Sequence, residues 1–84
     1  MIFVGQHQME RAILLEHLEV AREYAEKGRL YIARQKQGIA ALAAASADTS
    51  DAERILQILE MAQSCHLADM QRILNELDDT CLDS

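Results

Sequence analysis

Proline and tryptophan are absent from this sequence, and glycine, cysteine and phenylalanine together account for only six of its 84 residues. The lack of proline and the scarcity of glycine exclude a collagen-like chain and leave few breaks for a helix. Two cysteines are too few for a domain built on disulfides. Half of the residues are apolar, with alanine and leucine prominent, which excludes a disordered chain. The composition therefore predicts an α-helical protein.

The two cysteines, Cys65 and Cys81, are predicted to be free thiols. Cys65 lies inside a predicted helix and Cys81 in its tail, about 24 Å away along the helix axis. A disulfide requires Cα atoms within about 7 Å, so two free thiols in a reducing compartment are the better interpretation. The opening segment MIFV is too short to span a membrane and has no basic segment before it. We therefore expect a cytoplasmic protein without a membrane partner.

The first half of the chain predicts one long helix. From Leu14 onward, apolar and small residues alternate at spacings of four and three, at Leu14, Leu18, Ala21, Ala25, Gly28, Ile32, Gln35, Ile39 and Leu42. Repeats of this kind indicate a helix with a coiled-coil-like seam. Gly28 weakens it by about 1 kcal/mol relative to alanine, and Gln35 places an amide on the seam.

A second helix is predicted after the segment SADTSDAE, where Asp48, Thr49 or Ser50 can cap its start. The negative charges of Asp51 and Glu53 are then stabilised by the positive end of the helix dipole. The expected buried face has a 3.6-residue period and is widened by further apolar residues. It comprises Ile55, Leu59, Ala62, His66, Met70, Ile73 and Leu77.

Together these elements predict an all-α fold, an antiparallel two-helix hairpin that forms a single domain over residues 1–84. We expect helices over about 7–46 and 51–78, a turn at about 47–50, and a frayed tail at 79–84. Facing residue numbers should sum to about 97, so that Ile32 meets His66 and Arg29 pairs with Asp69.

In that register Leu14, Leu15 and Leu18 extend past the second helix and remain exposed. A chain of 84 residues is also near the lower limit for burying an adequate core alone. We therefore expect a homodimer of hairpins that forms a four-helix bundle.

Three stretches of the chain resemble a group of small helical proteins of alphaproteobacteria, such as those of rhizobia. They are EHLEVAREYAEKGRLYIARQKQGIAAL, ADTSDAERIL and CHLADMQRILNEL. The resemblance covers residues 16–77, and its more specific parts are residues 32–35, Asp48-Thr49, His66 and Arg72. The chain departs from the pattern at Met70 and Gln71, where the group is more charged. The resemblance implies a bacterial helical hairpin and implies no activity.

His66 is the strongest candidate in the sequence for a metal-binding or reactive residue. With Asp69 three residues later and Cys65 before it, it suggests part of a metal site, but Cys65 is rotated by about 100° and the expected facing residues offer no strong ligand. A phosphorylated histidine is disfavoured by the carboxylate of Asp69. We favour a structural role, in which His66 hydrogen-bonds Gln35, Tyr31 or water and sets the register of the helices.

A basic strip runs beside the first seam, because Arg22, Arg29 and Lys36 recur every seven residues. Tyr24 and Tyr31 lie on the other flank. The strip has two interpretations: a docking surface for an acidic protein or anionic ligand, or a partner for the acidic second helix. The second is favoured, since residues 48–84 carry nine acids and two bases.

No catalytic motif or cofactor-binding motif is present, so we expect a non-enzymatic protein that needs no cofactor. The leading hypothesis is a self-associating helical protein that serves another, unidentified protein as adaptor, small regulator or stabilising subunit. Its expected contact residues are Leu14, Leu15, Leu18, Arg22, Tyr24, Arg29, Tyr31 and Lys36.

Two other functions stay open. One is a metal- or small-ligand-binding bundle centred on His66. The other is a regulator that binds an anionic ligand or nucleic acid through Arg22, Arg29, Arg34 and Lys36. The net charge of −6 argues against nucleic acid, because it repels phosphate.

Overall fold

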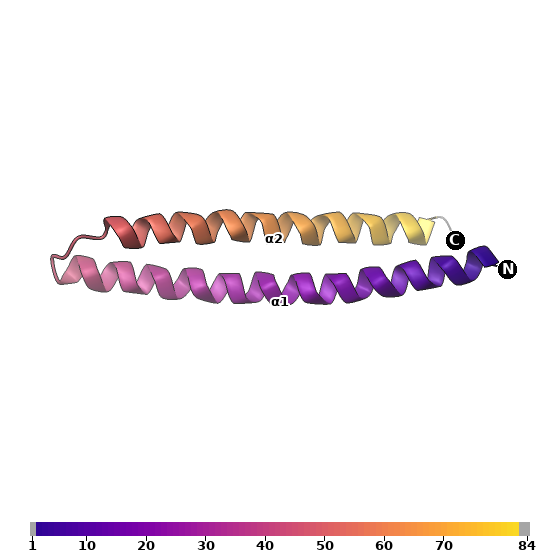
Figure 1. Cartoon of the computed structure of the whole chain (residues 1–84), viewed down its shortest axis with the longest axis horizontal. Coiled ribbons are helices and arrows are strands. Elements are labelled where there is room, and N and C mark those ends of the chain that lie inside the picture. The colour runs from indigo at the N-terminus through magenta and orange to yellow at the C-terminus, as the bar shows by residue number, and fades with distance from the viewer. Residues whose placement is uncertain (1, 83–84) are drawn as a thin grey trace.

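Two long helices lie antiparallel and side by side in the computed structural model, which describes residues 2–82 and the side chains of residues 9–79 (Figure 1). Helix α1 spans Ile2–Ala44 and helix α2 spans Ser50–Leu82, and residues 45–49 connect them. The molecule measures 68 × 14 × 14 Å. No strand occurs among residues 2–82, so the predicted all-α class with two helices is confirmed.

The helix boundaries differ from the predicted ones at four places, one of which is the start of α2, at Ser50 instead of residue 51. Helix α1 begins five residues earlier than expected and ends two residues earlier, at Ala44. Helix α2 continues to Leu82, whereas residues 79–84 were predicted to fray. Residues 79–82 contain no proline or glycine that would end the helix, although they carry no apolar repeat. Residues 83 and 84 of the predicted tail lie outside the described part of the chain.

The chain leaves α1 through a left-handed residue, Ser46, whose φ is 56°. The N–H of Ala47 donates to the carbonyl of Leu42 at 2.9 Å, and the N–H of Ser46 donates to the carbonyl of Ala43 at 3.0 Å. These two bonds form the Schellman arrangement that satisfies the last carbonyls of a helix, in which glycine usually takes the left-handed position. Serine therefore occupies a strained backbone position at the turn.

Replacing Ser46 by glycine should stabilise the hairpin by about 0.5–1 kcal/mol, because glycine adopts a left-handed conformation without the steric cost that a Cβ imposes. The measurement is urea unfolding followed by circular dichroism at one protein concentration. Ser64→Gly, in an exposed position within α2, is the control and should destabilise by a similar amount. A lower midpoint for Ser46→Gly would contradict the strain at this turn.

Polar side chains organise the start of α2, as the sequence predicted. The carbonyl of Thr49 accepts the first helical bond from the N–H of Glu53 at 2.9 Å. One carboxylate oxygen of Asp48 accepts from the hydroxyl of Ser50 at 2.6 Å and from its backbone N–H at 2.9 Å. These bonds hold the pKa of Asp48 below its ordinary value. The second helix is thus started by its own local sequence.

A continuous seam of least-exposed residues joins the helices. On α1 it follows the predicted alternation of four and three from Leu14 to Ile39, while Leu42 is exposed. On α2 the same alternation holds, at Ala52, Leu56, Leu59, Gln63, His66, Met70, Ile73 and Leu77. Both helices therefore keep the seven-residue repeat of a coiled coil.

The predicted register is wrong by one heptad. Gln63 Nε2 donates to the carbonyl of Ala25 at 2.8 Å, and Gln35 Nε2 donates to the carbonyl of Ala52 at 2.9 Å. The numbers of facing seam residues then sum to about 91, as a repeat of seven allows. His66 lies at the level of Ala25 instead of Ile32. The chain reverses through residues 45–49, earlier than expected, and a repeat of seven matches itself again after a slide of seven residues.

The corrected register changes what is buried at the open end of the hairpin. Leu18 is 7% exposed and forms a cluster with Ile73 and Leu77, against which Leu14 packs. The prediction that Leu14 and Leu18 are exposed is therefore wrong, because Leu18 is buried and Leu14 is half-buried, whereas Leu15 is exposed as expected. On the second helix, Ile55 and Ala62 lie outside the seam, because Leu56 and Gln63 take the expected places.

The shift of register also changes the ion pairs. Arg29 Nη2 lies 2.6 Å from Glu26 Oε1 on its own helix, instead of pairing with Asp69. Asp69 lies 3.7 Å from Arg72, also on its own helix. Neither helix of the described chain carries an apolar stretch long enough to cross a membrane.

Candidate functional site

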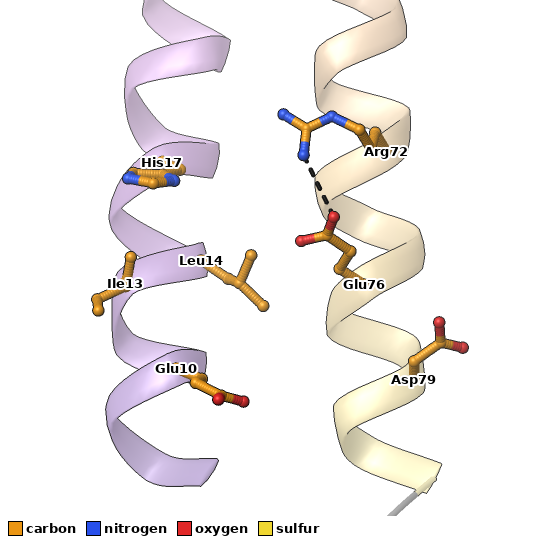
Figure 2. Close-up of a pocket in the computed structure, with 7 residues that line it drawn as sticks. All are labelled: Glu10, Ile13, Leu14, His17, Arg72, Glu76 and Asp79. Atoms are coloured by element: carbon orange, nitrogen blue, oxygen red, sulfur yellow. Dashed lines mark hydrogen bonds and ion pairs between the residues drawn. The ribbon is translucent and has the colours of Figure 1, made fainter. Parts of the chain in front are cut away.

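Three hollows follow one another along one side of the seam. The largest, about 510 Å³, lies near the open end of the hairpin (Figure 2). The next, of about 300 Å³, shares His17 and Arg72 with it. The third, of about 250 Å³, shares Tyr24 and His66 with the second. Because neighbouring hollows share lining residues, they form one continuous depression, which we call the groove.

The heptad repeat explains why these residues share one side. The residues that immediately precede a seam residue form one stripe on each helix. On α1 this stripe contains His17, Tyr24 and Tyr31, and on α2 it contains Ala62, Asp69 and Glu76, all of which line the groove. Residues that immediately follow a seam residue, such as Arg22 and Leu67, lie on the other side.

The hollow at the open end has an apolar floor and a charged rim. Leu14 extends from α1 toward α2, and the guanidinium of Arg72 extends from α2 toward α1 (Figure 2). Glu76 accepts a hydrogen bond from Arg72 at 3.2 Å. Glu10 and Asp79 add two more carboxylates to the lining. Ion pairs between side chains this exposed contribute little stability, so these charges are available to a partner.

In the middle of the groove, two aromatic rings, one from each helix, contact each other. The ring of His66 stacks on that of Tyr24, with centroids 5.8 Å apart and planes inclined by 18°. The ammonium of Lys27 lies 5.9 Å from the centre of the Tyr24 ring, within range of a cation–π interaction. His66 is half-buried on the seam, as predicted. It therefore contributes to the packing of α2 on α1 and also faces the groove.

The groups expected around His66 are arranged differently. The Gln35 amide donates to the carbonyl of Ala52 at another level of the hairpin, so Gln35, one of the three hydrogen-bond partners predicted for His66, is not its partner. Asp69 contacts Arg72. Cys65 immediately precedes the seam residue His66, and its side chain is exposed. Among the described residues, no three histidine, cysteine, aspartate or glutamate side chains are grouped so that they can hold a metal ion.

Gln63 is a seam residue that the sequence reasoning missed. Its Nε2 donates to the carbonyl of Ala25, while its Oε1 is buried without a hydrogen-bond partner. The amide fills the space left by the missing side chain of Gly28. The available signal was the spacing of seven from Leu56 and Met70, but the apolar neighbour Ala62 was assigned to the seam instead. Gln35 and Gln63 thus each bond a backbone carbonyl of the opposite helix.

The predicted contact residues fall into three groups. Leu14 and Leu18 belong to the seam within the chain. Tyr24 and Tyr31 line the groove and are about half exposed. Leu15 and the basic strip of Arg22, Arg29 and Lys36 are exposed on the side opposite the groove. Within the strip, the hydrogen bond from Arg29 and its charge hold the pKa of Glu26 below its usual value.

Exposed apolar side chains are concentrated on the groove side. Thirteen large apolar side chains of the described residues are exposed. Six of them belong to the groove side by lining or by heptad spacing: Ile13, Val20, Tyr24, Tyr31, Ile55 and Ile58. On the opposite side there are three, Leu15, Leu67 and Leu74. More of the exposed large apolar side chains therefore lie on the groove side than on the opposite side.

No protein-family model, curated protein or solved structure matches this chain. The groove and the exposed apolar residues are therefore the observations from which a function is inferred. The groove is shallow, extends along the molecule and lies between the two helices.

Proposed function

We propose that this chain is a self-associating helical hairpin that acts by protein–protein contact, as an adaptor, small regulator or stabilising subunit of another protein. One observation carries the proposal. Among the described side chains, only Leu18, Ile73 and Leu77 form a buried apolar cluster, whereas thirteen large apolar side chains are exposed. A two-helix hairpin with so small a core gains most of its stability when its apolar surface is covered.

The large solvent-accessible surface area of the chain supports burial of its exposed apolar side chains by a second hairpin. The chain exposes 6574 Å², whereas a compact protein of 9.4 kDa exposes about 5,000 Å². By the same scaling, a compact dimer exposes about 8,300 Å², so up to about 4,800 Å² is buried when two hairpins associate. That upper bound falls in the range of obligate homodimers. A four-helix bundle is the architecture that such burial produces from two hairpins.

Sedimentation velocity of the full chain tests self-association. We expect a mass of twice 9.4 kDa at micromolar concentration, and helical content that falls on dilution as the dimer dissociates. A monomer that keeps its full helical content and melting temperature at every concentration contradicts the proposal.

The partner is tested separately, on the surface opposite the groove. An Arg22→Glu/Lys36→Glu variant reverses two charges of the basic strip, and both residues are exposed. We expect the wild-type chain to retain an acidic protein from the native cell that this variant does not retain. The two purified proteins should then bind each other, with an affinity that falls as salt is raised. Equal capture by wild type and variant argues against a role for the strip.

A further inference from the structure

The charges on the groove side are distributed unevenly along the molecule. Toward the open end, four carboxylates line the groove, from Glu10, Asp69, Glu76 and Asp79, against one guanidinium, from Arg72. Toward the turn, Lys27 lines the groove and Arg34 lies seven residues further along the same stripe, against one carboxylate, that of Asp51, which precedes the seam residue Ala52. One end of the groove is therefore acidic and the other basic.

This polarity determines how a second copy fits. In a parallel pair the acidic ends of the two grooves lie together and repel each other. In an antiparallel pair each acidic end meets the basic end of the other copy, which is favourable. The antiparallel pair is also a closed two-fold arrangement, in which the same surface of both copies is used.

The two-fold axis of such a pair has a defined position. Residue 66 is the midpoint of α2, which spans Ser50–Leu82. When two hairpins overlap fully, the axis therefore passes close to His66 and Tyr24. Gly28 and Ala62, which line the groove beside them, are small enough to let the second copy approach closely. Each stacked pair of rings then meets its symmetry-related copy in the centre of the interface, where aromatic contacts contribute most to binding.

We propose that the occupant of the groove is a second copy of this chain, antiparallel to the first, with the Tyr24–His66 pairs of both copies at the two-fold axis. This inference rests on the proposed self-association and adds the face, the orientation and the centre of the dimer. His66 then lies in an interior that only the dimer encloses. The side opposite the groove, with the basic strip, remains on the outside of the bundle.

Distances between spin labels test the orientation. Three single-cysteine forms of the full chain are labelled: native Cys65 with Cys81→Ser, and Ile13→Cys and Gly38→Cys, each with Cys65→Ser and Cys81→Ser. Circular dichroism checks that each form is helical. In the antiparallel dimer the Cys65 labels lie near the axis, within about 20 Å of each other. The labels at 13 and 38 are each about 12 residues from the axis, so their pairs are separated by about 36 Å.

Each other result has a distinct meaning. Short distances at all three positions indicate a parallel dimer and overturn the proposed orientation. A dimer whose Cys65 labels are more than about 30 Å apart, three helix diameters, uses another face and leaves the groove to a different partner. A monomer in sedimentation overturns both the self-association and this inference.

A charge reversal provides a second measurement that does not depend on labels. Lys27→Glu/Arg34→Glu should weaken the dimer about tenfold at low salt, because acidic ends then face acidic ends. Mixing this variant with a Glu76→Lys/Asp79→Lys chain should restore the affinity as a heterodimer. The matched control, Arg22→Glu/Lys36→Glu on the opposite side, should leave the dissociation constant unchanged. An equal effect of both double reversals, or no restoration on mixing, overturns the proposed placement.

Discussion

Replacing Ile73 by alanine should destabilise the folded chain by about 2–4 kcal/mol. Ile73 is 3% exposed and is the centre of the apolar cluster that also contains Leu18 and Leu77. Truncating the side chain removes the favourable free energy of transferring the deleted apolar groups out of water, and it leaves a cavity between two long helices. Because this cluster is the only buried apolar cluster of the described residues, the loss is a large part of the total free energy of unfolding, which is about 5–15 kcal/mol for small proteins.

Thermal and urea unfolding by circular dichroism measure this effect, at a fixed protein concentration. Met61→Ala is the matched control, because Met61 lies on the same helix and is 70% exposed. We expect the control to change stability by less than about 0.5 kcal/mol. Equal effects of the two substitutions would show that the buried cluster at the open end is not what stabilises the hairpin.

Gly28 and Gln63 should be energetically coupled by about 1–2 kcal/mol in a double-mutant cycle. In most helices Gly→Ala stabilises by about 1 kcal/mol. Here a Cβ on residue 28 overlaps Gln63 Oε1, so the amide must leave and its bond to the Ala25 carbonyl is lost. That loss costs about 1 kcal/mol. The two effects cancel, and Gly28→Ala should be nearly neutral in the wild-type chain.

In a Gln63→Ala background the space is open, so the same Gly28→Ala change should stabilise the hairpin by about 1 kcal/mol. Gly38→Ala is the internal control, because no atom lies within 4 Å of a Cβ built there. It should stabilise equally in both backgrounds. Additive effects of the Gly28 and Gln63 substitutions would mean that the amide does not occupy the space beside Gly28 in solution.

The surroundings of His66 in the structure differ from those that its sequence neighbours suggested. His66 looked like part of a metal or catalytic motif because a cysteine and an aspartate are close to it in sequence. In the structure its ring stacks on Tyr24, while Asp69 lies 3.7 Å from Arg72. What makes His66 informative is its place at the midpoint of α2 on the groove. Its contacts are set by its neighbours in space, such as Tyr24, and not by its neighbours in sequence.

Local residues determined the helices of this protein. The absence of proline and the unbroken repeat from Leu14 to Ile39 predicted α1 and its seam correctly. The Asp48–Ser50 segment predicted the start of α2, because side-chain hydrogen bonds to nearby backbone groups depend only on neighbours. The half-burial of Gln35 and His66 also followed from their spacing.

The pairing of the helices was decided only by the tertiary structure. A seven-residue repeat matches itself again after a slide of seven, so the observed level of His66 at Ala25 and the predicted level at Ile32 both satisfy the pattern. The position of the turn at Ser46 and the bond from Gln63 to the opposite backbone select one of these registers. These features act between segments that are far apart in the sequence. The periodicity alone allows several registers of the two helices, and only the geometry of the turn and the amide contacts distinguishes one heptad from the next.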